Sequence, residues 1–158
     1  MTNKTLIVAA AALGLAVSLG SAPAFAQSSD VIYVNAADDI SAGKRALRRN
    51  QTDNAIRLFE RGLKKNIPGR LRVVGHNDLC IAYRFAGDLK AARENCDKAI
   101  ALNARYWRAY NNRANIYYDQ RNYLAAQADY ETALRLNPKS KLLRQNAGAI
   151  QALVISAN

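Results

Sequence analysis

The chain has 158 residues and carries 23 Lys and Arg against 12 Asp and Glu, which gives a formal net charge of +11. It contains one histidine, and its carboxylates do not cluster, so a metal site is not expected. It also has no serine-nucleophile motif and no glycine-rich phosphate loop, and we therefore predict neither an enzyme nor a bound cofactor.

Residues 1–26 have the parts of a secretory signal peptide. Lys4 supplies a positive start, an uncharged and mostly apolar run follows over residues 6–19, and small residues occupy both positions that signal peptidase reads. The apolar run is shorter than the roughly 20 residues needed to span a bilayer. We therefore expect cleavage between Ala26 and Gln27 and a periplasmic or secreted protein. The alternative is an uncleaved membrane anchor.

Residues 27–158 suit one domain with a modest core, and no transmembrane segment is expected in them. Loss of Lys4 lowers the net charge only from +11 to about +10. A basic surface favours anionic partners, such as an acidic protein, anionic lipid headgroups or a polyanionic wall polymer. No nucleic-acid partner is expected for an exported protein. The alternative is a basic surface without a specific partner.

Residues 27–35 have no helical periodicity and contain the polar run Ser28-Ser29-Asp30. We interpret them as a flexible lead-in, and we expect the folded part of the chain to begin at Ala36.

The rest of the chain repeats itself. Residues 73–106 align with residues 107–140 at a shift of about 34 residues. Residues 36–69 align with the second segment at a shift of about 37, and the extra residues fit in the breaker-rich stretch 67–71. The matched positions of the second and third segments are Tyr83 and Tyr117, Ala92 and Ala126, Ala99 and Ala133, Leu102 and Leu136, and Asn103 and Asn137.

The third segment carries a known pattern most clearly. Its matching residues are Tyr110, Ala114, Tyr117, Ala126, Tyr130 and Pro138. This pattern resembles the tetratricopeptide repeat (TPR), a unit of about 34 residues that folds as two antiparallel helices. Small alanines let the helices approach, tyrosines fill the wider gaps, and the proline ends the unit. Arg113 stands where leucine is usual, so we expect that position to be more exposed than the pattern implies.

The resemblance implies an all-α solenoid of three TPR units, 36–69, 73–106 and 107–140, with the first one degenerate. Residues 141–158 resemble one further helix, which would cap the last unit. We therefore expect seven helices in a right-handed superhelix. The sequence also resembles short secreted TPR proteins of Gram-negative bacteria, in which a basic, degenerate first unit precedes clearer ones.

The two cysteines lie on opposite arms of the second unit. Cys80 precedes the Gly87-Asp88 turn by seven residues and Cys96 follows it by eight, so an antiparallel hairpin places them at the same height. An exported protein meets an oxidising compartment, and we predict a Cys80–Cys96 disulfide. The alternative is a pair of buried thiols that act as small apolar residues.

Ligands of TPR proteins usually bind in the concave groove lined by the first helix of each unit. The residues that face away from the core of these helices are Lys44, Leu47 and Arg48 in the first unit, Val74, Asn77, Ile81 and Arg84 in the second, and Arg108, Asn111, Asn115 and Tyr118 in the third. Asparagine amides can hold an extended backbone, and arginines can hold a carboxylate. The alternative is a solvated polar face.

The resemblance therefore implies a non-enzymatic scaffold that binds a protein or peptide, which we expect to be acidic. The carboxylate clamp of chaperone-binding TPR domains is not reproduced, because Ile40 and Asp78 stand where it needs lysine and asparagine. His76 is expected to be a partly buried packing residue. The alternative function is a cationic envelope protein that binds an anionic polymer or membrane surface by charge.

Overall fold

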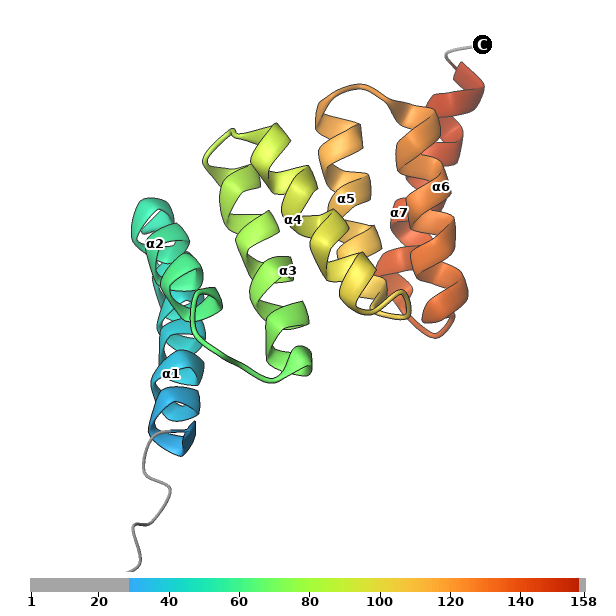
Figure 1. Ribbon diagram of the computed structural model, residues 1–158. Coiled ribbons are helices and arrows are strands. Elements are labelled where there is room, and N and C mark those ends of the chain that lie inside the picture. Colours follow the sequence, from blue (N-terminus) through green and yellow to red (C-terminus); the bar gives the residue numbers. More distant parts are fainter. Residues whose placement is uncertain (1–28, 157–158) are drawn as a thin grey trace, which may run out of the picture.

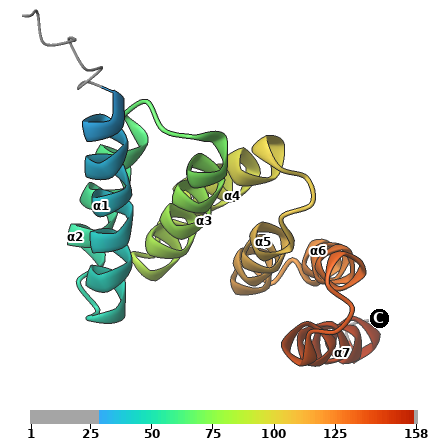
Figure 2. The same cartoon turned by 90° about the horizontal axis from the view of Figure 1, so that it is seen from below.

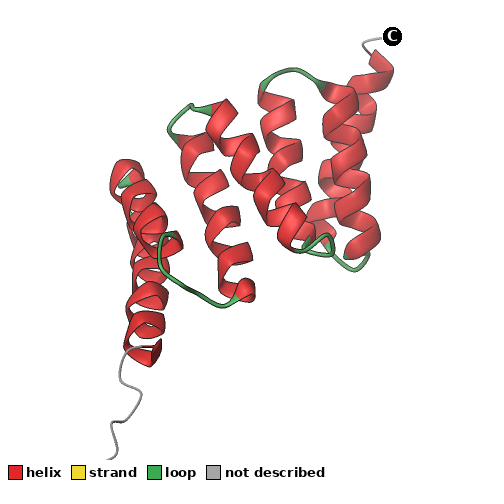
Figure 3. Ribbon diagram, in the orientation of Figure 1, coloured by secondary structure: helices red, strands yellow, loops and turns green. Residues whose placement is uncertain are grey.

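The computed structural model describes residues 29–156, and the side chains from Ala36 onward (Figure 1). Every element in this part of the chain is a helix, and Figure 3 shows no strand among the described residues. The helices are α1 (Ser29–Arg48), α2 (Thr52–Leu63), α3 (Gly69–Phe85), α4 (Leu89–Leu102), α5 (Trp107–Asp119), α6 (Tyr123–Leu136) and α7 (Lys141–Ser156). The predicted all-α fold is confirmed. The predicted signal peptide and its cleavage site at Ala26–Gln27 lie outside the described residues.

Consecutive helices pair as the antiparallel hairpins α1–α2, α3–α4 and α5–α6, and α7 packs against α6 (Figures 1 and 2). This arrangement has two distinct ends. The turns within the hairpins lie at one end, and the connections between hairpins lie at the other (Figure 1). We call these the turn end and the connection end. No helix among the described residues is long and apolar enough to cross a membrane.

The three turns within hairpins have the same backbone conformation at one position. In each turn a residue in the left-handed region precedes the N-cap residue of the next helix: Asn50, Gly87 and Arg121, at φ of 59°, 82° and 58°. The residue after it then caps the new helix in two of the three turns. Asp88 accepts a hydrogen bond from the Ala91 amide at 2.9 Å, and Asn122 accepts one from the Ala125 amide at 3.3 Å. These caps satisfy backbone donors that would otherwise have no partner.

The repeated alanines mark the closest helix contacts. Ala55, Ala92 and Ala126 occupy the same place in successive hairpins, and each is completely buried. The residue four positions later fills the space beside each alanine, and it is Phe59, Cys96 or Tyr130, all buried. Burial of such side chains stabilises the fold by about 1.5–3 kcal/mol each for the larger ones.

Each hairpin core is completed by the helix that follows it. Leu79 of α3 packs with Ile40 and Phe59 of the first hairpin, and Ile116 of α5 packs with the cysteine pair of the second. Ile150 of α7 does the same for the third hairpin. Because no hairpin closes its core alone, the molecule is a solenoid in which neighbours stabilise one another.

One expectation needs correction. Residues 29–35 were expected to be a flexible lead-in, but they form the first turns of α1. No proline or glycine interrupts the chain from residue 29 to residue 42, so the helix that begins around Ala36 extends backward, gaining one hydrogen bond per residue. Arg113 was expected to be more exposed than the pattern implies. It is half-buried, where the usual leucine would lie in the core, and it pairs with Asp97 and Asp129.

The structure joins Cys80 of α3 to Cys96 of α4, with their Cα atoms 5.3 Å apart. Both residues are completely buried, and they lie in the contact between the two helices of the central hairpin. The link therefore holds α3 against α4 at the middle of the solenoid.

Candidate functional site

One face of the solenoid is lined mainly by the first helix of each hairpin, with contributions from the end of α4 and from α7. Three adjoining hollows lie along it, and we call them together the inner groove. The central hollow has a volume of about 540 Å³. It shares Val74, Tyr106 and Arg108 with the hollow toward the connection end, and Lys44 and Asp78 with the hollow toward the turn end.

Many of the side chains predicted for the groove are brought together there. The central hollow is lined by Lys44, Val74, Asn77, Ile81, Arg108 and Asn111 among the predicted residues, and the hollow toward the turn end by Leu47 and Arg48. None of the three hollows of the inner groove is lined by the other predicted residues, Arg84, Asn115 and Tyr118. Arg84 forms a two-point ion pair with Asp119, at 2.6 and 3.0 Å.

Asn115 and Tyr118, the other two predicted residues that do not line the groove, also contact residues of the chain itself. The Asn115 amide oxygen accepts a hydrogen bond from the Tyr130 hydroxyl at 2.6 Å, which ties α5 to α6. The ring of Tyr118 lies 5.9 Å from the ring of Tyr123 and stays largely exposed. Both residues thus lie beyond the turn-end boundary of the central hollow.

The groove floor is an asparagine ladder that joins successive hairpins. The Asn112 amide nitrogen donates to Asn77 Oδ1 at 2.9 Å, and one hairpin later Asn146 donates to Asn111 Oδ1 at 3.1 Å. Asn77 and Asn111 are only 2% and 8% exposed. Their amide oxygens thus accept hydrogen bonds that fix the spacing of α3, α5 and α7. The donors of these bonds, Asn112 and Asn146, are more accessible.

Charges in the groove are unequally compensated. Lys44 lies 3.3 Å from the Asp78 carboxylate, and burial raises the pKa of that carboxyl despite the nearby lysine. Arg108 is exposed, and its guanidinium lies 4.5 Å from the centre of the Trp107 ring, stacked as in a cation–π contact. It forms no ion pair with a described carboxylate. Arg108 is therefore the groove cation best placed to receive an anion.

Five residues that line the central hollow were not predicted for the groove: Tyr106, Trp107, Asn112, Leu142 and Asp78. The first two stand at the start of α5, beside Arg108, and burial raises the pKa of the Tyr106 hydroxyl. Adjacent aromatic residues beside an arginine are a usable signal of an interaction surface, because aromatic and Arg side chains are enriched there. Leu142 comes from α7, whose approach to the groove depends on tertiary packing.

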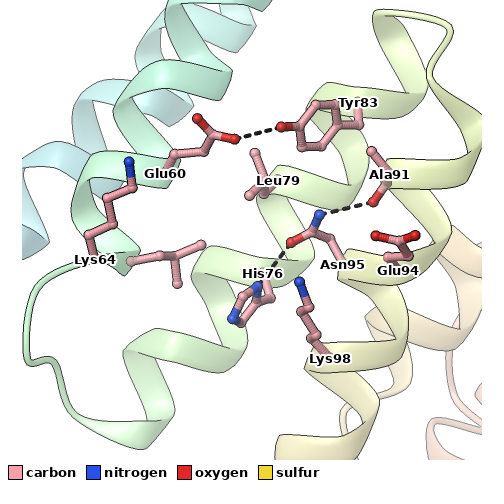
Figure 4. A pocket seen from close by; sticks show the side chains of 10 residues that line it. Glu60, Lys64, His76, Leu79, Tyr83, Ala91, Glu94, Asn95 and Lys98 are labelled. Carbon is pink, nitrogen blue, oxygen red and sulfur yellow. Dashed lines mark hydrogen bonds between the residues drawn. The ribbon is translucent and has the colours of Figure 1, made fainter.

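A separate hollow of about 420 Å³ lies among α2, α3 and α4 (Figure 4). In it, His76 Nδ1 lies 3.0 Å from Asn95 Oδ1, and the Asn95 amide nitrogen donates to the Ala91 carbonyl. That second bond fixes the amide orientation, so Asn95 accepts and His76 donates. Burial lowers the pKa of His76. His76 is thus half-buried and hydrogen-bonded, in line with the packing role expected for it.

Across the same hollow, the Tyr83 hydroxyl donates to Glu60 at 2.6 Å, and this bond raises the tyrosine pKa to about 12. The bond joins the first hairpin to the second (Figure 4). Among the described residues, no group of three His, Cys, Asp or Glu side chains is placed to hold a metal ion.

Comparison with known proteins identifies the repeat. Residues 107–140 match the family described as "Tetratricopeptide repeat", over the same residues that the pattern predicted. No curated protein matches the sequence.

Solved structures of TPR domains share the fold. The first TPR domain of human RPAP3 superposes with a TM-score of 0.71 at 23% identity, covering 77% of this chain and 94% of that chain. The first TPR of Spaghetti (RPAP3), bound to the HSP90 peptide SRMEEVD, gives 0.69 at 24% identity, with the same coverage. The Sgt2 TPR domain from Aspergillus fumigatus gives 0.71 at 20% identity, covering 78% of this chain and 81% of that chain. The described chain therefore has the fold of a TPR domain.

Proposed function

We propose that the protein is a non-enzymatic scaffold that binds an extended, acidic peptide segment of a partner protein in the inner groove. The observation that carries the proposal is Arg108, an exposed arginine stacked on Trp107 at the edge of a hollow of about 540 Å³. A guanidinium held in this way can form two parallel hydrogen bonds with a carboxylate. The HSP90 peptide bound by the TPR of Spaghetti supports peptide binding as a use of this fold.

The groove offers an extended peptide several kinds of contact. Tyr106, Trp107, Ile81 and Leu142 supply apolar area, and Asn112 supplies an amide beside Arg108. The contacts differ from a carboxylate clamp because Ile40 is buried in the core and Asp78 adds a negative charge next to Lys44. We therefore propose an acidic side chain of the peptide, rather than a cluster of carboxylates, as the group that Arg108 binds.

Selection from a random peptide library, followed by fluorescence anisotropy of the enriched peptides, tests the proposal. Enriched sequences should contain an acidic residue flanked by apolar ones. Arg108→Gln should weaken their binding about tenfold, since a hydrogen bond to a charged group contributes about 1.5–3 kcal/mol. The matched control is Arg93→Gln on α4, which removes the same charge from an exposed position outside the groove.

Equal losses in the two variants would show that overall charge, and not the groove, carries the binding. Salt provides a second comparison, because binding by charge alone should vanish by a few hundred millimolar salt while groove recognition should partly survive. Enrichment of peptides without acidic residues would contradict the role of Arg108.

We further propose that the scaffold acts in the periplasm or outside the cell, after removal of residues 1–26. The apolar run over residues 6–19 and the small residues before Gln27 support this location. N-terminal sequencing of the protein from a fractionated Gram-negative host should then begin at Gln27. Recovery of a chain that begins at Met1 would contradict export.

A further inference from the structure

Basic stretches without acidic side chains gather at one end of the solenoid. The connections α2–α3, α4–α5 and α6–α7 each lie in a stretch of sequence without an acidic side chain: residues 61–77, residues 98–118 and residues 132–158. Antiparallel pairing of the helices brings all three connections to the connection end (Figure 1). Charges that are far apart in sequence therefore meet on one edge of the molecule.

Most of these cations are free to act on a partner. Nine lysines and arginines lie in or next to the connections and are half-buried or exposed: Lys64, Arg70, Arg72, Lys98, Arg105, Arg135, Lys139, Lys141 and Arg144. None of them forms an ion pair with a carboxylate among the described side chains, whereas Arg61 and Lys65 pair with Asp39. This contrast shows that the described acids compensate only part of the charge there.

The turn end has a different balance. Asp53, Asp88 and Asp119 stand at or beside its three turns, and Asp119 is held by Arg84 from the neighbouring hairpin. Exposed cations are present there too: Arg45, Arg48, Arg49, Lys90, Arg93 and Arg121. Both ends are therefore basic, but carboxylates offset part of the charge at the turns, whereas the connections themselves carry none.

Two exposed leucines accompany the cations at the connection end. Leu102 is the last residue of α4 and Leu142 lies in the first turn of α7, with about half of each side chain exposed. A surface that combines lysines and arginines with exposed apolar side chains matches the interface of a bilayer, where cations meet phosphate headgroups and apolar groups enter the acyl boundary. A soluble polyanion would use the cations alone.

From this placement we propose that the connection end is a docking surface for membranes that contain anionic phospholipids. The headgroup phosphates bind the unpaired lysines and arginines of the three connections, and Leu102 and Leu142 add apolar contact. The surface lies at one end of the helices and the inner groove along their side. Arg70, Leu102 and Leu142 line the edge of the groove nearest that end and belong to both, so a docked molecule keeps the rest of its groove open to a peptide. The proposal does not depend on the peptide-binding function.

Vesicle co-sedimentation at about 150 mM salt, near a Debye length of 8 Å, tests the proposal. The chain from Gln27 is suitable because it contains all the described helices and every core contact among them; circular dichroism and melting confirm its fold. It should sediment with vesicles of phosphatidylcholine and phosphatidylglycerol, and not with phosphatidylcholine alone. Each basic residue at such a surface contributes about a fivefold change in partition. The variant Lys64→Gln, Arg105→Gln, Lys139→Gln, Lys141→Gln should therefore partition about 600-fold more weakly.

The matched control removes four exposed charges from the turn end: Arg45→Gln, Arg49→Gln, Lys90→Gln and Arg93→Gln. None of the eight residues lines the inner groove, so peptide binding is unaffected by either variant. The control should lose less than about tenfold in partition. If the connection-end variant proves misfolded, the double variant Lys139→Gln, Lys141→Gln should still lose about 25-fold.

Three results would overturn the proposal. Equal losses in the two charge variants would mean that net charge, not its placement, drives binding. Equal partition onto vesicles with and without phosphatidylglycerol would exclude headgroup recognition. Binding to inorganic polyphosphate that the connection-end variant abolishes, without binding to vesicles, would identify a soluble polyanion as the partner in place of a membrane.

Discussion

At the scale of single residues, His76 is a half-buried group whose protonation lowers the stability of the folded chain. Its pKa lies below the ordinary value of 6.5, mainly because burial disfavours the charged imidazole, and Lys98 and Arg72 act in the same direction. Between the folded and the unfolded pKa, the unfolded chain binds more protons than the folded chain. The free energy of unfolding therefore falls as pH drops through about 6.5.

The variant His76→Gln should lose this dependence because glutamine does not titrate. Urea denaturation of both proteins from about pH 7.5 to pH 5 should show a difference in unfolding free energy that changes in favour of the variant as the pH falls. Asp39, whose pKa is lowered by its hydrogen bond with Arg61, contributes to both proteins equally. Parallel pH curves would contradict a neutral, half-buried His76.

Arg113 is a second residue whose environment predicts a measurable effect. It donates to Asp129 at 2.7 and 2.8 Å and to Asp97 at 2.6 Å, and these bonds raise its pKa. Asp129 is only 6% exposed. Arg113→Leu restores the residue usual in the repeat but leaves that carboxylate without its partner, which should cost about 3 kcal/mol in unfolding free energy.

Adding Asp129→Leu to this variant should recover much of the loss, because replacing both members of a buried pair by apolar groups is often neutral. Arg135→Leu, an exposed change two turns from the pair, should cost under about 0.5 kcal/mol. A double variant as unstable as Arg113→Leu alone would show that packing, and not the unpaired carboxylate, causes the loss.

At the scale of helices, the central hairpin is linked covalently. The bond between Cys80 and Cys96 closes a loop with a sequence separation of 16 residues. In the chain-entropy description such a loop stabilises the folded state by about 3 kcal/mol. The double variant Cys80→Ala, Cys96→Ala should lower the unfolding free energy by about that amount, measured by chemical denaturation without reductant.

Alkylation of the native protein provides the independent check. Mass spectrometry without reductant should find neither cysteine modified after denaturation in iodoacetamide. Modification of both residues, or equal stability of the double variant and the wild type, would favour two buried thiols that act as packing residues.

Two helical glycines differ in what an added methyl group would meet. A Cβ at Gly43 of α1 would lie 2.6 Å from the ring of buried Phe59, whereas one at Gly148 of α7 has nothing within 4 Å. Gly43→Ala should therefore overpack the contact between α1 and α2 and cost about 1–3 kcal/mol. Gly148→Ala should stabilise the protein by about 0.5–1 kcal/mol, because alanine is the better helix former.

Thermal melts of the two variants should move in opposite directions. A fall in melting temperature for both would mean that the outer face of α7 is covered in solution, and no loss for Gly43→Ala would mean that α1 packs less closely on α2 than the structure shows.

At the scale of the whole molecule, stability depends on the contact between each hairpin and the helix that follows it. The last contact is testable with two isoleucines of α7. Ile150 is 1% exposed and packs into the third hairpin, whereas Ile155 is 69% exposed. Ile150→Ala should cost about 2–5 kcal/mol and Ile155→Ala under about 0.5 kcal/mol, measured by urea denaturation. Similar small costs for both would show that α7 does not cap the solenoid.

The sequence by itself determined the elements and their register. Helix periodicity is a local property, so Ala92 and Ala126 could be placed in the close contacts, and Cys80 could be matched in height with Cys96 by counting from the turn. The same counting placed Lys44, Asn77 and Arg108 on the groove side of their helices. The start of α1 was not predicted, because residues 29–35 lack the apolar spacing from which a helix is recognised.

Only the tertiary structure decided which of these side chains remain available to a partner. Periodicity assigns a residue to a helix face, but its bonding partner on the next helix depends on how far successive hairpins rotate and rise. That geometry pairs Arg84 with Asp119 and buries Asn77 against Asn112, while it leaves Arg108 stacked on Trp107 without an ion pair among the described carboxylates. It also gathers the basic connections at one end, since antiparallel helices return every second loop to the same side.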